Sequence, residues 1–588
     1  MLFRRWSRRD ILYFTLIGIT EILIFFRNPG HFFMGDTLLW MGYRYHSIGD
    51  FFRGFVTVDP TLWYRPLAQR TVVSVLYPLF GLHPFPYHAV MFVLFFACTL
   101  GVFLVTEQLT ESRRAAWIAT LFFVPNVTHA FTTYDPAFVP EMMFTLFYVG
   151  SVIGWVVWLR SQNQRALVVS AALFVGSLLS KETAVALPFT LFVIWLCLPQ
   201  KKPVRLRSLA PHFAILALYL VFAIGYLHIR AVDIRGLIER PGTAGQPGYE
   251  LVLGKNVLES VKVAFSWAFG IPRGVYGQWS FDASWMLGGL RFVRTIILVA
   301  ALLVLLTPRR KYLLIGIAWF LITAAPTLPL LDHFLPYYIF APLIGLSIAV
   351  GAVLDWAYSR CAKYAPSLTF AACAALIAVV MVIEIGAVSR ASADHFLLGG
   401  SAQNAQTGMN DMLGLFPILQ KDTALFIFDE EEPSLYWEHA HGMLYQMAYG
   451  DKTIKTIYSS EGIPISPDDL NSGKAIVLKW TGGHLIDITS FVKQRPELLL
   501  PHPPDQRYHL MLSKSGVMTI PELHDVTLNV LRAYNGIIEE PFQVKLDAHG
   551  QTDFKLESNA KPGIYTFIAV QHVGEPSWVT VSGSIPVP

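Results

Sequence analysis

Charged residues are scarce in this chain of 588 residues: Asp, Glu, Lys and Arg make up only 15% of it, against 54% hydrophobic residues. Ordinary soluble proteins carry about a quarter charged residues, so the composition excludes an ordinary cytosolic protein. Aromatic residues make up 14%, and the long apolar runs exclude a disordered chain, because they bury more surface than is needed to offset the cost of ordering. The sequence therefore predicts a multi-pass membrane protein.

Cysteine is rare as well. The four cysteines lie in or beside apolar runs, and none follows Cys373. This distribution excludes a disulfide framework and a cysteine metal site.

Basic residues are few toward the C-terminus. From Arg390 onward there are 14 Lys and Arg against 23 Asp and Glu, a net charge of −9, so the preceding residues carry +13 within a total of +4. The C-terminal region, which has the composition of a soluble domain, is thus acidic, and this argues against nucleic acid as a partner. A basic membrane part with an acidic tail fits a tail that lies away from the anionic cytoplasmic leaflet.

Eleven apolar segments are long enough to predict transmembrane helices. They lie near residues 11–26, 86–106, 115–132, 139–159, 166–180, 184–199, 209–228, 291–307, 312–331, 337–357 and 367–388. The predicted fold class is an α-helical polytopic membrane protein of about eleven spans, followed by an extracytoplasmic α/β and β-sandwich region. The predicted domains are 1–390, 391–500 and 501–588.

The loop charges predict the orientation. Arginines before the first apolar run and basic pairs on alternate loops place the N-terminus in the cytoplasm, whereas the short loops 133–140 and 332–336 carry no Lys or Arg. An odd number of spans then places the C-terminal region outside a cell inner (plasma) membrane, in the periplasm of a bacterial cell. A cleaved signal peptide is the alternative, but the first run ends at residues 25–29 without small residues, which favours an uncleaved anchor.

Two outer loops are long, at residues 27–85 and 229–290. Each contains a semi-apolar stretch, 67–80 and 257–269, that is too short or too polar for a span and predicts a helix in the membrane interface. In the tail, runs at 424–428 and 475–478 with a helical stretch at 432–449 predict a small α/β unit. Alternating strands at 564–570 and 578–581 predict a β-sandwich.

Five motifs follow one another in the membrane part. A Gly-Asp-Thr stretch at 35–37 and a Tyr-Arg-Pro-Leu element at 64–67 lie in the first long outer loop, which ends in Gly-Leu-x-Pro-x-x-Tyr-His at 81–88. A Ser-Lys-Glu element follows at 180–182, and a Tyr-rich stretch begins a late span at 336–345. Over residues 10–390 this order resembles the GT-C superfamily of polytopic glycosyltransferases. The nearest resemblance is to the protein O-mannosyltransferase and transmembrane O-mannosyltransferase branch and its bacterial relatives.

The chain departs from that branch in three places. Relatives often show two adjacent acids where this chain has Gly35 and Asp36. They often carry a Glu after a His-Pro in the third-span region, where this chain reads Pro-Asn-Val-Thr-His at 125–129 and the next acid is Asp135. No tetratricopeptide repeats follow the membrane part.

The resemblance implies transfer of a sugar, with inversion, from a polyprenyl-phosphate or diphosphate carrier to an acceptor hydroxyl on the outer face. A carboxylate must take the hydroxyl proton, and we assign this role to Asp36, with Asp135 orienting the acceptor or Asp36. The departing phosphate needs fixed cations and donors, a role that fits Arg65 and Lys181. Further phosphate ligands are expected at Arg273, His333 and Tyr337, and supporting roles at Tyr64, His88, His129 and Glu182.

Each of these residues also has a structural interpretation. Asp36 is also a residue that commonly caps a helix. Lys181 and Glu182 can form a local ion pair at a helix end, and His333 can lie in the membrane interface. No cofactor is expected. A divalent metal remains an alternative, because oligosaccharyltransferase relatives use one, but it needs two or three carboxylates together.

The expected partners are a polyprenyl-phosphate-linked sugar, membrane lipids, and a protein, lipid or glycan acceptor. Three other functions compete with sugar transfer. A non-catalytic membrane anchor that displays an acidic adhesive tail leaves the long outer loops, with their aromatic and basic residues, unexplained. A transporter or flippase of lipid-linked saccharides predicts polar residues near the bilayer midplane, whereas the charged candidates here lie toward one face. A polymerase or ligase of lipid-linked saccharides is an enzyme class that these residues do not separate from a transferase.

Overall fold

A computed structural model describes residues 7–494 with gaps at 26–30, 59–63, 199–205, 229–238, 241–248, 272–283, 331–332, 395–399, 430–431, 433 and 460–472, together with shorter pieces of 511–587. The described residues fall into two compact units. The first lies within 1–31, 43–243 and 247–399, and the second within 32–42, 244–246 and 400–588. The second unit thus combines the C-terminal region with a short segment of the first long outer loop.

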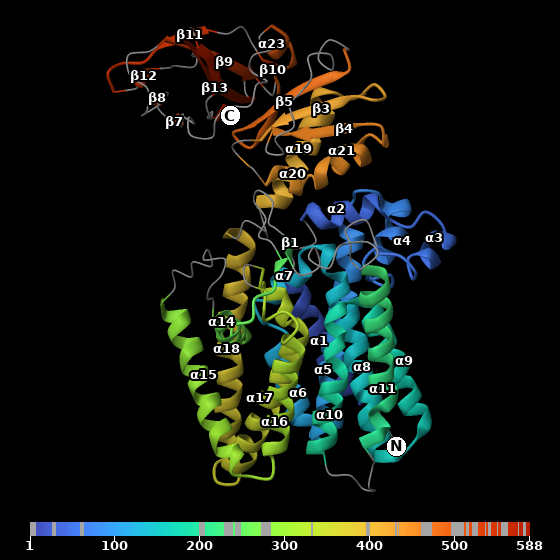
Figure 1. Cartoon of the computed structure of the whole chain (residues 1–588). Helices are drawn as coiled ribbons and strands as arrows, with labels where there is room; N and C mark the ends of the chain where they lie inside the picture. Colours follow the sequence, from blue (N-terminus) through green and yellow to red (C-terminus); the bar gives the residue numbers. More distant parts are fainter. Residues whose placement is uncertain are drawn as a thin grey trace. The chain divides into compact units, whose positions relative to one another are not determined.

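The first unit is a bundle of helices (Figure 1). Within the described residues, five helical stretches are long and apolar enough to cross a membrane: Phe85–Thr110, Pro136–Ser161, Leu206–Ala223, Pro336–Cys361 and Pro366–Val388. The prediction of a multi-pass helical membrane protein is confirmed at this level, and the number of eleven crossings stays a prediction.

The other six predicted segments also contain helices. These are α1 (Arg8–Ile24), α6 (Arg113–Phe123), α9 (Gln164–Ser180), α10 (Leu187–Cys197), α15 (Ser284–Leu305) and α16 (Arg310–Ala324). Prolines and short caps divide several of them, and α6 ends just before Pro125. The two predicted interfacial stretches likewise form helices, α4 (Thr71–Phe80) and α14 (Lys255–Ala268).

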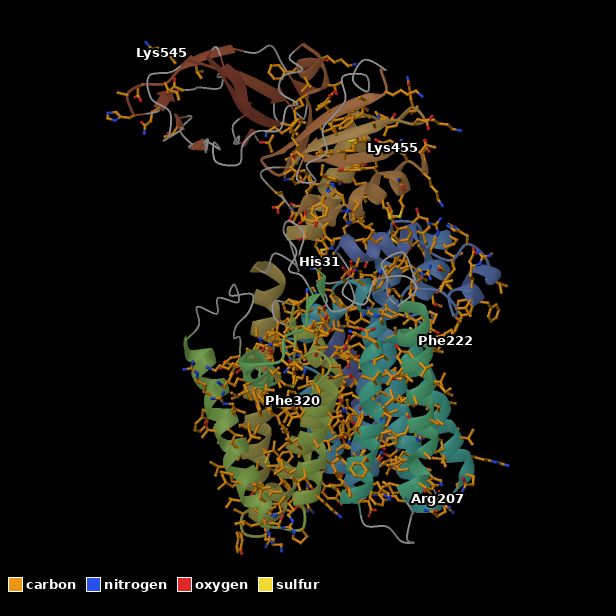
Figure 2. The ribbon with its side chains drawn as sticks, in the orientation of Figure 1. His31, Arg207, Phe222, Phe320, Lys455 and Lys545 are labelled. Atoms are coloured by element: carbon orange, nitrogen blue, oxygen red, sulfur yellow. The ribbon has the colours of Figure 1, made fainter. Side chains whose placement is uncertain are left out.

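Small residues let neighbouring helices of the bundle pack closely. A Cβ atom on Gly316 of α16 would lie 2.4 Å from the carbonyl oxygen of Gly345, which belongs to the adjacent α17 (Phe340–Cys361; Figure 1). Between α8 (Val139–Ser161) and α9, the Ser151 hydroxyl donates to the Ser170 carbonyl at 2.7 Å. Small residues that allow close approach are characteristic of helix packing in membranes. Large side chains such as the buried Phe320 fill the remaining interior (Figure 2).

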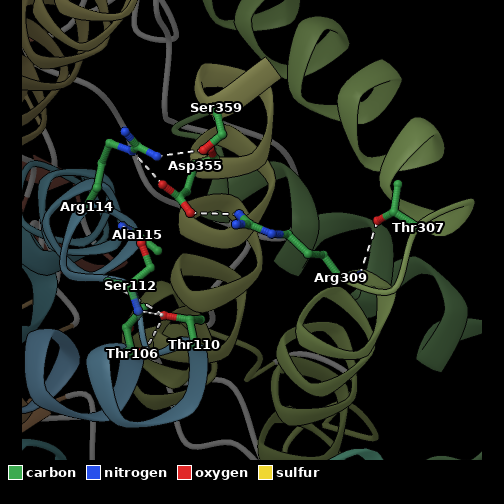
Figure 3. A network of polar contacts seen from close by, with 9 residues as sticks. All are labelled: Thr106, Thr110, Ser112, Arg114, Ala115, Thr307, Arg309, Asp355 and Ser359. Carbon is green, nitrogen blue, oxygen red and sulfur yellow. Dashed lines mark hydrogen bonds and ion pairs between the residues drawn. The ribbon is translucent and has the colours of Figure 1, made fainter. Parts of the chain in front are cut away.

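A charged network joins three helices near the C-terminal end of α17. Buried Asp355 accepts from Arg114 Nε at 2.5 Å and from Arg309 Nη1 at 2.7 Å (Figure 3). Arg114 also donates to Ser359 at 2.6 Å. One carboxylate therefore ties α6 and the start of α16 to α17.

The second unit centres on a mixed ten-stranded sheet. Its main path is β14-β13-β9-β10-β6-β5-β3-β4, with β11 (Phe542–Lys545) beside β9 and β15 (Ser584–Val587) beside β13. The main strands in chain order are β3 (Ala424–Phe428), β4 (Lys455–Tyr458), β5 (Ala475–Thr481), β6 (His484–Asp487), β9 (Thr527–Tyr534), β10 (Ile537–Ile538), β13 (Gly563–Val573) and β14 (Glu575–Val579). A separate three-stranded sheet contains β7 (Met511–Leu512), β8 (Val517–Thr519) and β12 (Gln551–Asp553).

The sheet differs from the expected division of the tail. β10 pairs in parallel with β6, so strands from both predicted tail regions belong to one sheet rather than to an α/β unit and a separate sandwich. Helix α19 (Ser401–Leu415) precedes β3, and α20 (Leu435–Glu438), a turn at Ala440–Gly442 and α21 (Met443–Ala448) connect β3 to β4. The predicted helical stretch 432–449 is therefore broken, because His441 and Gly442 adopt φ angles of 53° and 87°.

Candidate active site

A charged cluster lies in the first unit where the first long outer loop meets the end of α9. The Arg65 guanidinium donates to both carboxylate oxygens of Glu182, from Nε at 2.8 Å and from Nη2 at 2.6 Å. Two residues later, the Leu67 amide donates to the Leu179 carbonyl at 3.1 Å. The loop that carries Arg65 is thus fixed to α9 by both side-chain and backbone hydrogen bonds.

The backbone leaves the helical conformation at Lys181. α9 ends at Ser180, Lys181 is extended with φ −159° and ψ 140°, and a 3-10 helix begins at Glu182. The break lets two adjacent side chains reach different partners. Glu182 contacts Arg65, whereas Lys181 Nζ binds Glu141 Oε2 in the first turn of α8.

Two tyrosines complete the cluster from the start of the late span. Lys181 Nζ lies 5.0 Å from the ring centroid of Tyr338 and 5.4 Å from that of Tyr337. Tyr337 also approaches His333, with 3.5 Å between its hydroxyl and Nε2, and its ring packs on Phe138 at 4.5 Å. Aromatic faces attract a cation, so the tyrosines hold the Lys181 ammonium in addition to Glu141.

Burial is uneven across this cluster. The Lys181 and Glu141 side chains are 5% and 3% exposed, whereas those of Arg65 and Glu182 are 12% and 40% exposed. The two cations and two carboxylates form two ion pairs, and the cluster is most accessible at Glu182. Arg65 and Lys181 supply the bidentate donor and the point charge that bind phosphate groups in proteins.

Four other predicted residues have backbone groups as hydrogen-bond partners. Asp135 is buried and accepts from the Ala137 amide at 2.9 Å, which caps a short 3-10 helix. The Tyr64 hydroxyl donates to the Phe55 carbonyl at 3.0 Å. His88 contacts the His31 carbonyl at 3.1 Å, and His129 contacts the Phe123 carbonyl at 2.8 Å within an aromatic core.

Two further predicted residues are not part of this arrangement. Asp36 lies in the first turn of α2 (Gly35–Gly42), which belongs to the second unit. Arg273 lies outside the described residues. Among the residues that the structure describes, no three His, Cys, Asp or Glu side chains are close enough to hold a metal ion, so no chemical step is derived through a metal.

Sequence reasoning missed Glu141. The residue occupies the third position of α8, inside a segment that had been interpreted only as a span. Because an acid within a predicted membrane segment is costly unless it is paired, its position was the signal that could have identified it.

Residues 65–227 match a protein-family model described as dolichyl-phosphate-mannose-protein mannosyltransferase. The matched segment contains all four charged members of the cluster. No curated protein matches the chain by sequence.

Two solved structures are similar to the chain at low identity. ArnT from Cupriavidus metallidurans, bound to undecaprenyl phosphate, is 13% identical with a TM-score of 0.49, over 81% of this chain and 93% of that one. The Archaeoglobus fulgidus oligosaccharyltransferase AglB, in complex with an inhibitory peptide and a dolichol-phosphate, is 12% identical with a TM-score of 0.43, over 87% of this chain and 74% of that one.

The match over residues 65–227 supports the predicted resemblance for that part of the chain and indicates a glycosyltransferase.

Proposed function

We propose that the protein transfers a sugar from a polyprenyl-phosphate donor to an acceptor hydroxyl on the outer face of the membrane, with inversion at the anomeric carbon. The observation that carries this proposal is the cluster in which Arg65 and Lys181 are held by Glu182 and Glu141. The family description for the segment containing these residues names a sugar linked to a polyprenyl phosphate and a protein acceptor, which supports the donor class.

The reaction needs one bond to form and one to break at the anomeric carbon. The acceptor oxygen attacks that carbon from the face opposite the phosphate, and the bond between the carbon and the phosphate oxygen breaks with its electron pair going to the phosphate. Asp36 takes the hydroxyl proton. Arg65 and Lys181 stabilise the charge that develops on the leaving phosphate, and such fixed donors contribute most to the rate when they are oriented beforehand.

The carboxylate partners have a definite role in this mechanism. Glu182 fixes the plane of the Arg65 guanidinium, and Glu141 with the two tyrosines fixes the Lys181 ammonium. The two cations are therefore oriented before the donor arrives, and little reorganisation accompanies phosphate binding. We therefore assign phosphate recognition to the junction of the first outer loop, α8 and α9.

The proposed placement follows from loop charge. The N-terminus and the Arg114–Asp355–Arg309 network lie on the cytoplasmic side of the plasma membrane, and the acidic C-terminal region lies outside. Tyr338 and Asp355 are 17 residues apart along Pro336–Cys361, about 25 Å of helix, which is close to the hydrocarbon thickness.

The test is sugar release from a panel of radiolabelled polyprenyl-phosphate sugars by purified protein, with and without a chelator. Wild-type turnover that is lost in Asp36→Asn and reduced at least tenfold in Arg65→Lys supports the proposal. The matched control is Arg114→Lys, which changes an arginine–carboxylate pair in the other network and should retain turnover.

Folded wild-type protein that releases no sugar from any monophosphate donor contradicts the proposal. The panel is then repeated with diphosphate donors, and the same protein in vesicles is assayed for movement of labelled lipid-linked sugar between leaflets. Movement without transfer assigns the protein to the transporter class.

A further inference from the structure

Helix α2 lies early in the chain, yet it is part of the C-terminal unit. Residues 32–42 group with 400–588, and α2 packs within that unit against α20 and α21. Given the proposed function, α2 carries the catalytic base, Asp36. We propose that the C-terminal domain holds Asp36 in its working orientation, and that Trp437 and Met443 are the positioning residues.

The first contact is at the beginning of α2. Gly35 has φ +40°, and a Cβ atom there would lie 2.4 Å from Cε2 of the Trp437 indole. Only glycine therefore fits against this ring, both because of the left-handed backbone and because of the missing space. Trp437 belongs to α20, next to buried Glu438.

The second contact is at the other end of the helix. A Cβ atom on Gly42 would lie 2.4 Å from Sδ of Met443, the first residue of α21. Both ends of α2 are thus in close contact with the C-terminal domain. The rigid Trp437 indole at one end and the Met443 side chain at the other limit where α2 can lie.

The rest of α2 is oriented accordingly. Thr37, Leu38, Trp40 and Met41 are buried, whereas Asp36 is exposed. The packing therefore turns the apolar face of α2 inward and directs the carboxylate away from the packed face. A small rotation of α2 would move Asp36 while leaving most of the helix covered.

The two positioning residues are themselves held firmly. They flank the turn at Ala440–Gly442, where a Cβ atom on Gly442 would lie 2.3 Å from Thr456 of β4. Buried His439 contacts the hydroxyl groups of Tyr445 and Tyr458 at 2.9 and 3.2 Å. The residues that pack against α2 are therefore connected to the sheet of the C-terminal domain.

The experiment uses the full-length protein and a pair of compensating substitutions. Gly42→Ala places a methyl group against Met443 and should lower kcat about 10- to 100-fold, because a displacement of about 1 Å has effects of that size on an oriented group. The KM for the donor should change less than threefold, because Arg65 and Lys181 lie in the other unit. Met443→Ala in the Gly42→Ala background removes the obstructing atoms and should restore kcat to within about threefold of Met443→Ala alone.

Gly414→Ala is the matched control, because Gly414 lies in the same unit and a Cβ atom there meets nothing within 4 Å. It should leave kcat unchanged. Wild-type kcat in folded Gly42→Ala, or a double variant as impaired as Gly42→Ala, overturns the inference. If Gly42→Ala fails to fold, Trp437→Ala tests the packing of α2 by removing the contact at its beginning. An unchanged kcat in Trp437→Ala likewise overturns the inference.

Failure of the proposed function gives a different result. If Asp36→Asn retains wild-type turnover, Asp36 is not the base and the proposed mechanism is wrong, whatever Gly42→Ala does. If turnover is lost in Asp36→Asn but not in Gly42→Ala or Trp437→Ala, Asp36 is still assigned as the base. Only its positioning by the C-terminal domain is then rejected.

Discussion

Arg65 and Glu182 are 117 positions apart in the chain, yet two hydrogen bonds of 2.8 and 2.6 Å join their side chains. This pairing connects the first outer loop to the non-helical residues that follow α9. It gives the Arg65 guanidinium one fixed plane, which a lone arginine on a loop does not have.

Replacement of Arg65 by Lys should lower kcat/KM for the lipid-linked donor by about 10- to 1,000-fold. Lysine keeps the charge but cannot donate two parallel hydrogen bonds to Glu182, and the loss of one oriented donor has effects of about this size. Initial rates over a series of donor concentrations measure the change. An Arg65→Lys variant with wild-type kcat/KM shows that the guanidinium geometry is not used.

Substitutions of Lys181 and Glu141 should compensate each other in unfolding free energy but not in donor turnover. Lys181→Met leaves the Glu141 carboxylate buried without its ammonium partner, which should cost about 3–5 kcal/mol of unfolding free energy. Lys181→Met combined with Glu141→Leu should recover most of that stability and remain inactive. Thermal unfolding in detergent together with donor turnover tests both statements, and an active double variant removes Lys181 from the mechanism.

The Asp355 network provides a structural contrast (Figure 3). Asp355→Asn retains the side-chain size but weakens hydrogen bonds to Arg114 and Arg309, which are 45% and 40% exposed and can turn to solvent. We expect a loss of about 1–3 kcal/mol in stability and an unchanged KM for the donor. An Asp355→Asn variant with a raised KM for the donor and unchanged stability contradicts this prediction.

The contribution of Glu438 to the stability of the C-terminal domain should fall as the pH rises from about 4.5 to 7. Glu438 is 1% exposed, and burial, with the Glu432 carboxylate nearby, raises its pKa from 4.5 to about 7. In this interval the folded state keeps a proton that the unfolded state releases, so stability from this group is present below pH 4.5 and is lost toward pH 7.

The magnitude of this effect is on the order of 3 kcal/mol, and Glu438→Gln should abolish it. Burial lowers the pKa of His439 to about 3, which gives the opposite slope, so the measured quantity is the difference between wild type and Glu438→Gln at each pH. A difference that does not vary between pH 4.5 and 7 contradicts the prediction.

The sequence predicted the helical bundle because apolar length and loop charge are local properties. It also placed strands at 424–428 and 475–478, where β3 and β5 lie, because alternation and turn residues are local as well. The joining of the two tail regions through β10 and β6 depends on pairing between distant segments. No pattern in either segment specifies that partner.

The same distinction applies to the site. Arg65, Lys181, Glu182 and Tyr337 were selected from motifs, and the structure brings them together. Glu141 was missed because it lies in the segment 139–159, which was interpreted only as a transmembrane helix. The inclusion of α2 in the C-terminal unit was missed because it depends on two glycines and on side chains about 400 residues later.

Under the proposed mechanism, the packing of α2 against Trp437 and Met443 also sets when the enzyme can first act during its synthesis. α2 is made about 400 residues before α21, which at about 5–20 residues per second is about 20–80 s. A chain interrupted in that interval after residue 182 contains Arg65 and Lys181 but lacks Trp437 and Met443. On the proposed mechanism, such a chain has the residues assigned to the donor phosphate but not those that orient the base, so activity begins only once the C-terminal domain has been made and folded.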